Sequence, residues 1–212
     1  MNCKCLFSLL LVTLFNFSIV SCSNNKPTSK PQISAEKEYL LTDFENTSMD
    51  FSMNAGSFRE KKFLIDGDHT LKAEAGYSSE QAKSGKYSLK CDVSANNWGC
   101  VGMGGLHLPA FNHIPWEKVN KIKFFVYGKK TGAKCEIIFE DFYSEQFSYF
   151  FEDNFVGWKE IIIPFESFSV RTRWQPPYAE KDGYIDTPIK WIFFHTAGPT
   201  FSIYVDDIYF CE

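Results

Sequence analysis

The chain has 212 residues, enough for one domain with its own hydrophobic core. Its formal net charge of −4 argues against the basic footprint of a nucleic-acid-binding protein, so no nucleic-acid partner is expected. Aromatic residues make up 17% of the chain, a content that favours packed β-sheets over a helical bundle.

The N-terminal segment has the pattern of a bacterial lipoprotein signal. Lys4 supplies a positive charge, an apolar run extends from Leu6 to Val20, and Ser21 directly precedes Cys22. We therefore predict a signal peptide at residues 1–21 and lipidation of Cys22. An ordinary secretory peptide with an incidental cysteine is the alternative. The lipid would be the membrane contact, at the bacterial cell envelope: the outer membrane or cell surface of a bacterium with two membranes.

Residues 22–37 lack apolar periodicity and contain two prolines, as in a flexible tether. Over residues 38–212 short apolar runs alternate with Gly, Asn, Asp and Pro, which predicts an all-β sandwich domain. Between Thr47 and Gly76 the pattern is irregular, and we expect a long excursion with one or two edge strands. The predicted strands are Tyr39–Phe44, Ser88–Ser94, Cys100–His107, Lys121–Tyr127, Cys135–Asp141, Gln146–Phe151, Lys159–Pro164, Trp191–Thr196 and Ser202–Phe210.

The segment WKEIIIPFESFSVRTRWQPP, residues 158–177, joins a strand to a polar turn. Its three consecutive isoleucines, residues 161–163, predict a covered strand that Pro164 ends, because proline donates no backbone hydrogen bond. Arg171, Arg173 and Trp174 follow where burial is not expected. A guanidinium beside an exposed indole suits a ligand with polar edges and an apolar face; a decorated surface loop is the alternative. Three tryptophans are expected to be core or wedge residues: Trp98, Trp158 and Trp191.

Together with four other segments of the chain, this segment resembles the family 11 carbohydrate-binding modules. They are LLTDFEN (residues 40–46), SGKYSLKC (84–91), NWG (97–99) and YVDDIYF (204–210). The resemblance spans residues 40–212 and implies a jelly-roll β-sandwich of two antiparallel sheets, galactose-binding-domain-like. Modules of this family are usually attached to β-glucan-degrading enzymes. By position it implies Arg171 as a sugar-binding arginine and Trp174 as a stacking aromatic ring.

Several positions depart from the family's pattern of binding residues. Two cations replace acids, an asparagine and a threonine replace tyrosines, and a glutamine replaces a histidine: Arg173, Lys190, Asn97, Thr196 and Gln146. Tyr143 and His195 are further candidates for the groove. We expect a groove that is more cationic and less aromatic than the family's, which favours an acidic or modified glycan, or a loss of affinity.

Four acids are candidates for a structural calcium site. Asp43 and Glu45 share one face of the first strand, and Asp206 and Asp207 interrupt the last strand. The first and last strands of a jelly roll are often adjacent, and carboxylates suit the oxygen ligands that calcium takes. The resemblance implies Glu45 and Asp206 as the better ligands, with Asp43 and Asp207 secondary. Solvated edge acids are the alternative.

No G-x-S-x-G, H-E-x-x-H or phosphate-loop motif is present in the sequence. The acid pairs Glu140–Asp141 and Glu152–Asp153 are adjacent, so a strand sends their members to opposite faces, unlike the facing carboxylates of glycosidases. We predict a noncatalytic, lipid-anchored carbohydrate-binding module that holds poly- or oligosaccharide, with any glycan-degrading enzyme a separate partner. An envelope scaffold or assembly protein is the alternative. Four cysteines of the predicted domain allow three complete disulfide pairings: Cys91, Cys100, Cys135 and Cys211.

Overall fold

The structure is a computed structural model that describes residues 36–52, 59–60, 62–196 and 198–212. The predicted signal peptide, the lipidation site Cys22 and all but the last two residues of the tether lie outside the described residues. In the described part of the chain no helix is long and apolar enough to cross a bilayer.

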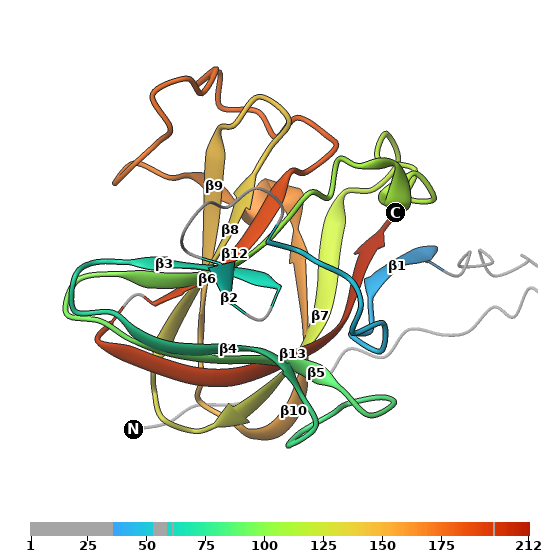
Figure 1. Ribbon diagram of the computed structural model, residues 1–212. Helices are drawn as coiled ribbons and strands as arrows, with labels where there is room; N and C mark the ends of the chain where they lie inside the picture. Colours follow the sequence, from blue (N-terminus) through green and yellow to red (C-terminus); the bar gives the residue numbers. More distant parts are fainter. Residues whose placement is uncertain (1–35, 53–58, 61, 197) are drawn as a thin grey trace, which may run out of the picture. The chain divides into compact units, whose positions relative to one another are not determined.

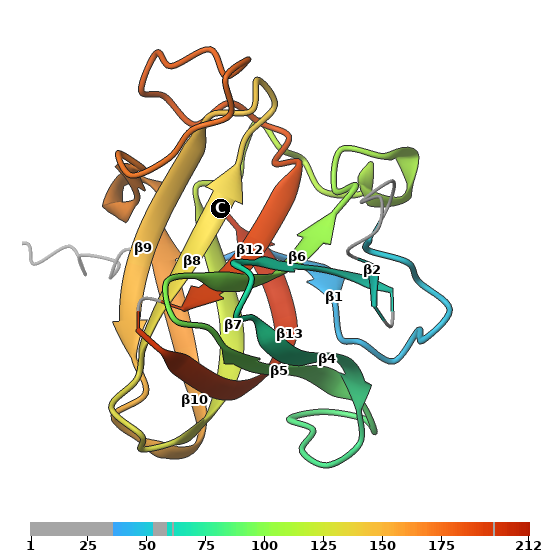
Figure 2. The same cartoon turned by 60° about the vertical axis from the view of Figure 1, so that its left-hand side comes forward.

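The described strands form two antiparallel sheets (Figures 1 and 2). Sheet A has the order β10-β7-β13-β5-β4, with β1 also paired to β13: β1 (Glu38–Thr42), β4 (Lys72–Ser78), β5 (Ser88–Ser94), β7 (Lys121–Lys129), β10 (Val156–Pro164) and β13 (Thr200–Cys211). Sheet B has the order β11-β9-β8-β12-β6-β3-β2: β2 (Arg59–Glu60), β3 (Phe63–Gly67), β6 (Gly99–Gly104), β8 (Lys134–Glu140), β9 (Gln146–Glu152), β11 (Ser169–Val170) and β12 (Trp191–Thr196). Two short 3-10 turns, η2 (Pro109–Phe111) and η3 (Phe165–Ser167), complete the elements.

Phenylalanine rings from the two sheets meet in the core. Phe124 of β7 contacts Phe194 of β12 with ring centroids 5.9 Å apart, and Phe139 of β8 contacts Phe210 of β13 at 6.2 Å. All four side chains are fully buried. Truncating one such ring to alanine typically costs about 3–5 kcal/mol of stability. The predicted all-β sandwich of two antiparallel sheets is confirmed.

The irregular region between residues 47 and 76 contains more strands than we predicted. β2 and β4 are edge strands, as expected, but β3 lies inside sheet B, where it pairs with both β2 and β6. The sequence gives little sign of β4, because Ala75 and Gly76 are the only residues of that strand that are buried. A strand with so few large apolar residues shows no clear alternation.

Two predictions for the Trp158–Pro177 segment are wrong. Ile162 is 49% exposed, and Trp158 packs edge-on against Tyr127 on the outer face of sheet A, at 5.6 Å, instead of in the core. The reason is that β10 is an edge strand with one open face, so only Ile163 of the isoleucines is fully covered. Pro164 does end the strand, as predicted.

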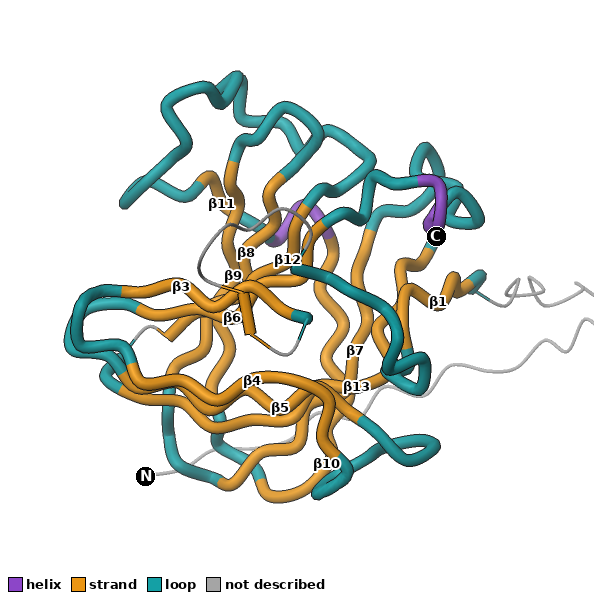
Figure 3. Tube along the Cα trace, viewed as in Figure 1, coloured by secondary structure: helices purple, strands orange, loops and turns teal. Residues whose placement is uncertain are grey.

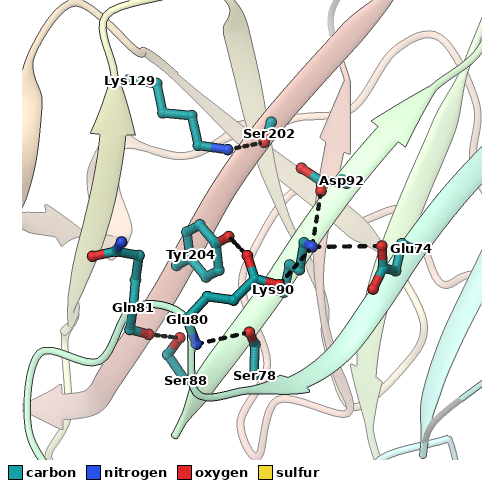
Figure 4. A network of polar contacts seen from close by, with 10 residues as sticks. All are labelled: Glu74, Ser78, Glu80, Gln81, Ser88, Lys90, Asp92, Lys129, Ser202 and Tyr204. Carbon is teal, nitrogen blue, oxygen red and sulfur yellow. Dashed lines mark hydrogen bonds and ion pairs between the residues drawn. The ribbon is translucent and has the colours of Figure 1, made fainter.

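A polar network covers part of the outer face of sheet A (Figure 4). Lys90 Nζ lies 3.1 Å from Glu80 and 3.5 Å from both Glu74 and Asp92, and these acids raise the lysine pKa. The Tyr204 hydroxyl donates to Glu80 at 2.5 Å. The opposite outer face, on sheet B, carries the candidate site. At one end of sheet B the loops β8–β9 and β11–β12 extend together (Figure 3), joined by the bond from Phe142 N to Asp186 O.

The four cysteines of the described residues are buried free thiols. Burial raises the pKa of Cys100 and Cys135 to about 12, and that of Cys211 to about 11. Burial also raises the pKa of the Cys91 thiol well above its ordinary value. None of the disulfide pairings left open by the sequence is formed.

Candidate functional site

The outer face of sheet B contains a hollow of about 560 Å³. Strands β3, β6, β8 and β12 form its floor, and the loops that follow β5 and β11 form two of its walls. The lining residues are Leu64, Asp66, Asn97, Trp98, Cys100, Ile138, Glu140, Gln146, Arg171, Arg173, Trp174, Phe193 and His195. Six of the eight residues predicted for a ligand groove are among them, and so the fold gathers side chains from four separate parts of the chain.

The other two predicted groove residues lie outside the hollow. Thr196 follows His195 in β12, so strand alternation turns it to the core side, where it is 1% exposed. Its hydroxyl hydrogen-bonds the carbonyl of Gly198. Tyr143 is 51% exposed in the β8–β9 loop, with its ring against Phe142.

A chain of polar contacts runs along one side of the hollow. Arg171 donates from an Nη to Gln146 Oε1 at 3.0 Å, and Gln146 Nε2 donates to Glu140 Oε2 at 3.1 Å. Arg171 Nε lies 3.6 Å from the carboxylate of Glu136. Burial lowers the pKa of Arg171 in spite of that neighbour, and burial raises the pKa of Glu140. These side chains are held in place by one another before any ligand arrives.

Glu136 lies on the same face of β8 as the lining residues Ile138 and Glu140, covered by its neighbours, and was not recognised from the sequence. It is 1% exposed, and its second oxygen lies 3.0 Å from His195 Nδ1, in an approach that is poorly aligned for a hydrogen bond. Burial opposes its charge, but His195 and Arg171 outweigh burial and hold the pKa of Glu136 below its ordinary value. The available signal was an acid in the middle of the apolar strand CEIIF, since buried acids are rarely left unpaired.

Trp98 stands at the rim of the hollow, so its predicted core position is wrong. Its indole is 39% exposed and stacks on the His195 imidazole, with centroids 6.4 Å apart and an interplanar angle of 10°. Asp68 fixes its loop, because that carboxylate accepts the backbone N–H of Asn97 at 2.7 Å and of Trp98 at 3.3 Å. A bond from the Thr70 hydroxyl, with these backbone N–H groups, holds the pKa of Asp68 well below its ordinary value.

Two further rings lie flat on β6. Trp191 and Phe193 stack at 5.5 Å with an interplanar angle of 10°, and each lies opposite a glycine of β6, Gly104 and Gly102. A Cβ at Gly104 would clash with the Trp191 ring, and one at Gly102 would lie 2.7 Å from Phe193. The core position predicted for Trp191 is therefore wrong. Phe193 of this pair lines the hollow, which therefore contains an aromatic ring that the sequence did not suggest, because Gly102 makes room for it.

The wall after β11 carries Arg173 and Trp174. The Trp174 ring is 53% exposed at the rim, and the Arg173 guanidinium lies over the Phe150 ring at 5.5 Å. The side chain of Gln175 bonds the backbone of Gln146 and so ties this wall to β9. Trp174 and Arg173 are both exposed, as the sequence predicted.

The sequence model of one protein family, described as "Carbohydrate binding domain (family 11)", matches residues 26–208. The chain belongs to this family. The resemblance seen in the sequence is thus confirmed. A search of curated proteins finds no match to this family 11 chain.

Solved structures similar to this chain include family 11 modules. The module of the cellulosomal cellulase Lic26A-Cel5E of Clostridium thermocellum is 21% identical, with a TM-score of 0.61 over 84% of this chain and 95% of that chain. The Clostridium thermocellum module in complex with a β-1,3-1,4-mixed-linked tetrasaccharide is 20% identical, with a TM-score of 0.62 over 84% and 96%. A β-1,2-glucanase from Parabacteroides distasonis is 12% identical, with a TM-score of 0.51 over 70% of this chain and 22% of that chain. These likenesses show the fold.

Three of the four acids predicted as calcium ligands, Glu45, Asp206 and Asp207, contact one loop of this family 11 domain, residues 79–87. A bulge in β13, with Asp207 at φ 48°, directs two carboxylates to that loop. Asp206 accepts the backbone N–H of Lys83 at 2.8 Å, and Asp207 accepts the Ser84 hydroxyl at 2.8 Å. Burial raises the pKa of Asp206 to about 6.

Glu45 holds the same loop from the end of β1. Its carboxylate accepts the N–H groups of Lys86 and Tyr87, each at 2.7 Å, and packs where a Cβ on Gly85 would clash with it. Asp43 accepts the backbone N–H of Glu45 at 3.1 Å. Among the described residues no group of three or more metal-binding side chains gathers. A calcium ion here would need backbone carbonyls beside these carboxylates, and calcium stays a prediction.

Proposed function

We propose that this protein is a noncatalytic glycan-binding module, anchored through a lipid on Cys22 at the bacterial cell envelope. The observation that supports this most is the hollow on sheet B, which combines the rings of Trp98, Trp174 and Phe193 with the fixed polar groups of Arg171 and Gln146. Aromatic faces pack on the C–H faces of sugar rings, while amides and guanidiniums bind hydroxyls. A volume of about 560 Å³ lies in the ordinary range for small ligands.

The ligand that we propose is an oligosaccharide or an internal segment of a polysaccharide. The Clostridium thermocellum module is in complex with a β-1,3-1,4-mixed-linked tetrasaccharide, so that compound is the first probe to use.

We propose no catalytic role for the lining acids. Glu140 is engaged by the Gln146 amide, and its neighbour Asp141 accepts the backbone N–H groups of Glu145 and Asp186. Asp141 is therefore a structural group that fixes the loops β8–β9 and β11–β12 to each other. Any glycan degradation would be done by a separate enzyme that acts on the glycan this module holds.

We also propose a structural calcium ion at the 79–87 loop, with Glu45 and Asp206 as its first carboxylates and Asp43 and Asp207 as secondary ones. Oxygen ligands from acids and carbonyls are what calcium takes. Such an ion would strengthen the attachment of the loop to β1 and β13.

The experiment is affinity gel electrophoresis against a polysaccharide panel that includes mixed-linked β-glucan. We expect retardation by at least one polysaccharide and about a tenfold loss of affinity in Trp174→Ala, corresponding to about 1.4 kcal/mol. The matched control is Tyr184→Ala, since Tyr184 is 73% exposed in the same loop but does not line the hollow. Binding to no polysaccharide, or equal retardation of Trp174→Ala and the parent, would contradict the proposal.

A further inference from the structure

Neither ring nitrogen of His195 makes a well-aligned hydrogen bond: Nδ1 lies 3.0 Å from Glu136, and Nε2 has no such neighbour among the described residues. His195 is 4% exposed and lines the hollow, and within the described part of the chain nothing bonds its Nε2. Buried polar atoms are nearly always paired, and an exception calls for a physical explanation. The Trp98 indole stacks on the imidazole and is 39% exposed, and both rings line the hollow, so Nε2 lies beside the space that a ligand would occupy.

Glu136 determines which nitrogen of His195 carries the proton. A carboxylate only accepts hydrogen bonds, and Glu136 Oε2 lies 3.0 Å from Nδ1. The hydrogen of a neutral imidazole therefore belongs on Nδ1, because two lone pairs at that distance would repel each other. Nε2 is then left as an acceptor.

The side chains that line the hollow include equal numbers of guanidiniums and carboxylates. Two guanidiniums, Arg171 and Arg173, line it together with two carboxylates, Asp66 and Glu140. Glu136, on the same face of the sheet, adds a third carboxylate 3.6 Å from Arg171, so acids outnumber guanidiniums around the hollow. The cationic groove expected from the sequence is therefore absent, and an anionic ligand would meet acids and the lone pair of Nε2.

We propose that the hollow recognises a neutral glycan, that His195 Nε2 binds one of its hydroxyls, and that Glu136 is the positioning residue for that contact. This inference rests on the proposed glycan-binding function and names its ligand class. A hydroxyl fits because it donates to a neutral imidazole and also accepts from a protonated one. The carboxylate of an acidic sugar only accepts, so it pairs with the protonated form alone.

Calorimetric titration of the β-1,3-1,4-mixed-linked tetrasaccharide, beside an oligogalacturonide of equal length, tests the ligand class. We expect the neutral tetrasaccharide to bind the wild-type protein more tightly. His195→Phe keeps a flat ring under Trp98 and removes the nitrogen, so we expect about a tenfold weaker affinity, the typical loss for one hydrogen bond. His107→Phe is the matched control, because His107 is exposed and lines no part of the hollow.

A second measurement needs no variant that could fail to fold. Nitrogen-15 NMR of the wild-type imidazole at pH 8 should show the proton on Nδ1 and a shift of the Nε2 signal when tetrasaccharide is added. In Glu136→Gln, whose amide can also donate, we expect that tautomer preference to weaken.

The outcomes separate the two proposals. Tetrasaccharide binding that is unchanged in His195→Phe, an Nε2 signal that does not move, or tighter binding of the oligogalacturonide overturns this inference and leaves glycan binding intact. If wild-type protein binds neither compound and no polysaccharide retards it, the proposed function itself fails, and this inference with it.

Discussion

The side chain of Gln175 pairs with the backbone of Gln146 as a neighbouring strand would. Its Oε1 accepts the Gln146 N–H at 2.7 Å, and its Nε2 donates to the Gln146 carbonyl at 2.7 Å. A third bond reaches the carbonyl of Arg171 at 2.9 Å. One amide therefore fixes the wall that carries Arg171 and Trp174 against β9, and glycan binding should depend on a residue that does not line the hollow.

Gln175→Ala removes these three bonds. We expect a loss of about 1.5–4.5 kcal/mol in the free energy of unfolding, since each of the three bonds contributes about 0.5–1.5 kcal/mol, and a several-fold weaker glycan affinity. Urea denaturation and affinity electrophoresis measure the two effects. Gln81→Ala is the control, because the hydrogen bond at Gln81 uses its backbone carbonyl (Figure 4) and Gln81 does not line the hollow. Full retention of glycan affinity in Gln175→Ala would show that the wall is held by other contacts.

Gly102→Ala places a methyl group 2.7 Å from the Phe193 ring. The ring must move into the hollow, so we expect a stability loss of about 1–3 kcal/mol, as for overpacked sites, and weaker tetrasaccharide binding. Thermal melting and calorimetry check both. Gly198→Ala is the matched substitution, because a Cβ there meets nothing within 4 Å. Equal melting temperatures for the two variants would mean that the floor adapts without strain.

Asp68→Asn tests the support of the Trp98 loop through its pH dependence. The lowered pKa of Asp68 means that its ionised form stabilises the native state above the ordinary value of about 4, and that this contribution is lost as the pH falls through the native pKa. We expect the melting-temperature gap between wild type and Asp68→Asn to be largest near neutral pH and to narrow below pH about 4. A gap that widens on acidification would assign the effect to another group.

Calcium should raise the melting temperature of the domain relative to a chelator. A ligand that binds only the folded state at 100 times its Kd adds about 2.7 kcal/mol. We expect Asp206→Asn to lose this response, while Glu166→Gln, an exposed acid of η3, keeps it. Identical melting curves in calcium and in chelator would mean that no calcium binds, and that these acids stabilise the domain through their hydrogen bonds alone.

The sequence predicts the sandwich well wherever large apolar residues alternate. β5 (Ser88–Ser94) and β12 (Trp191–Thr196) have the predicted bounds, because their buried residues are bulky. The position of β4 was not predicted within the region where edge strands were expected, since Ala75 and Gly76 show no such pattern. The family resemblance located the wall at Arg171 and Trp174, which sequence alternation alone does not orient.

Much of the floor depended on pairings between distant strands. Nothing local shows that Trp191 and Phe193 lie opposite glycines of β6, or that Glu136 of β8 lies beside His195 of β12. The register of sheet B creates both relationships. The residue types at the predicted groove positions therefore suggested a cationic groove. The acids and aromatic rings that offset this charge come from strands for which the sequence did not show which face each side chain occupies.

The four sequestered sulfhydryls, with no bridge among them, leave the folded domain without a covalent cross-link to break. Dithiothreitol and oxidised glutathione should therefore leave its melting curve in place. Folding would need no thiol-oxidising catalyst, on whichever side of a membrane the polypeptide matures.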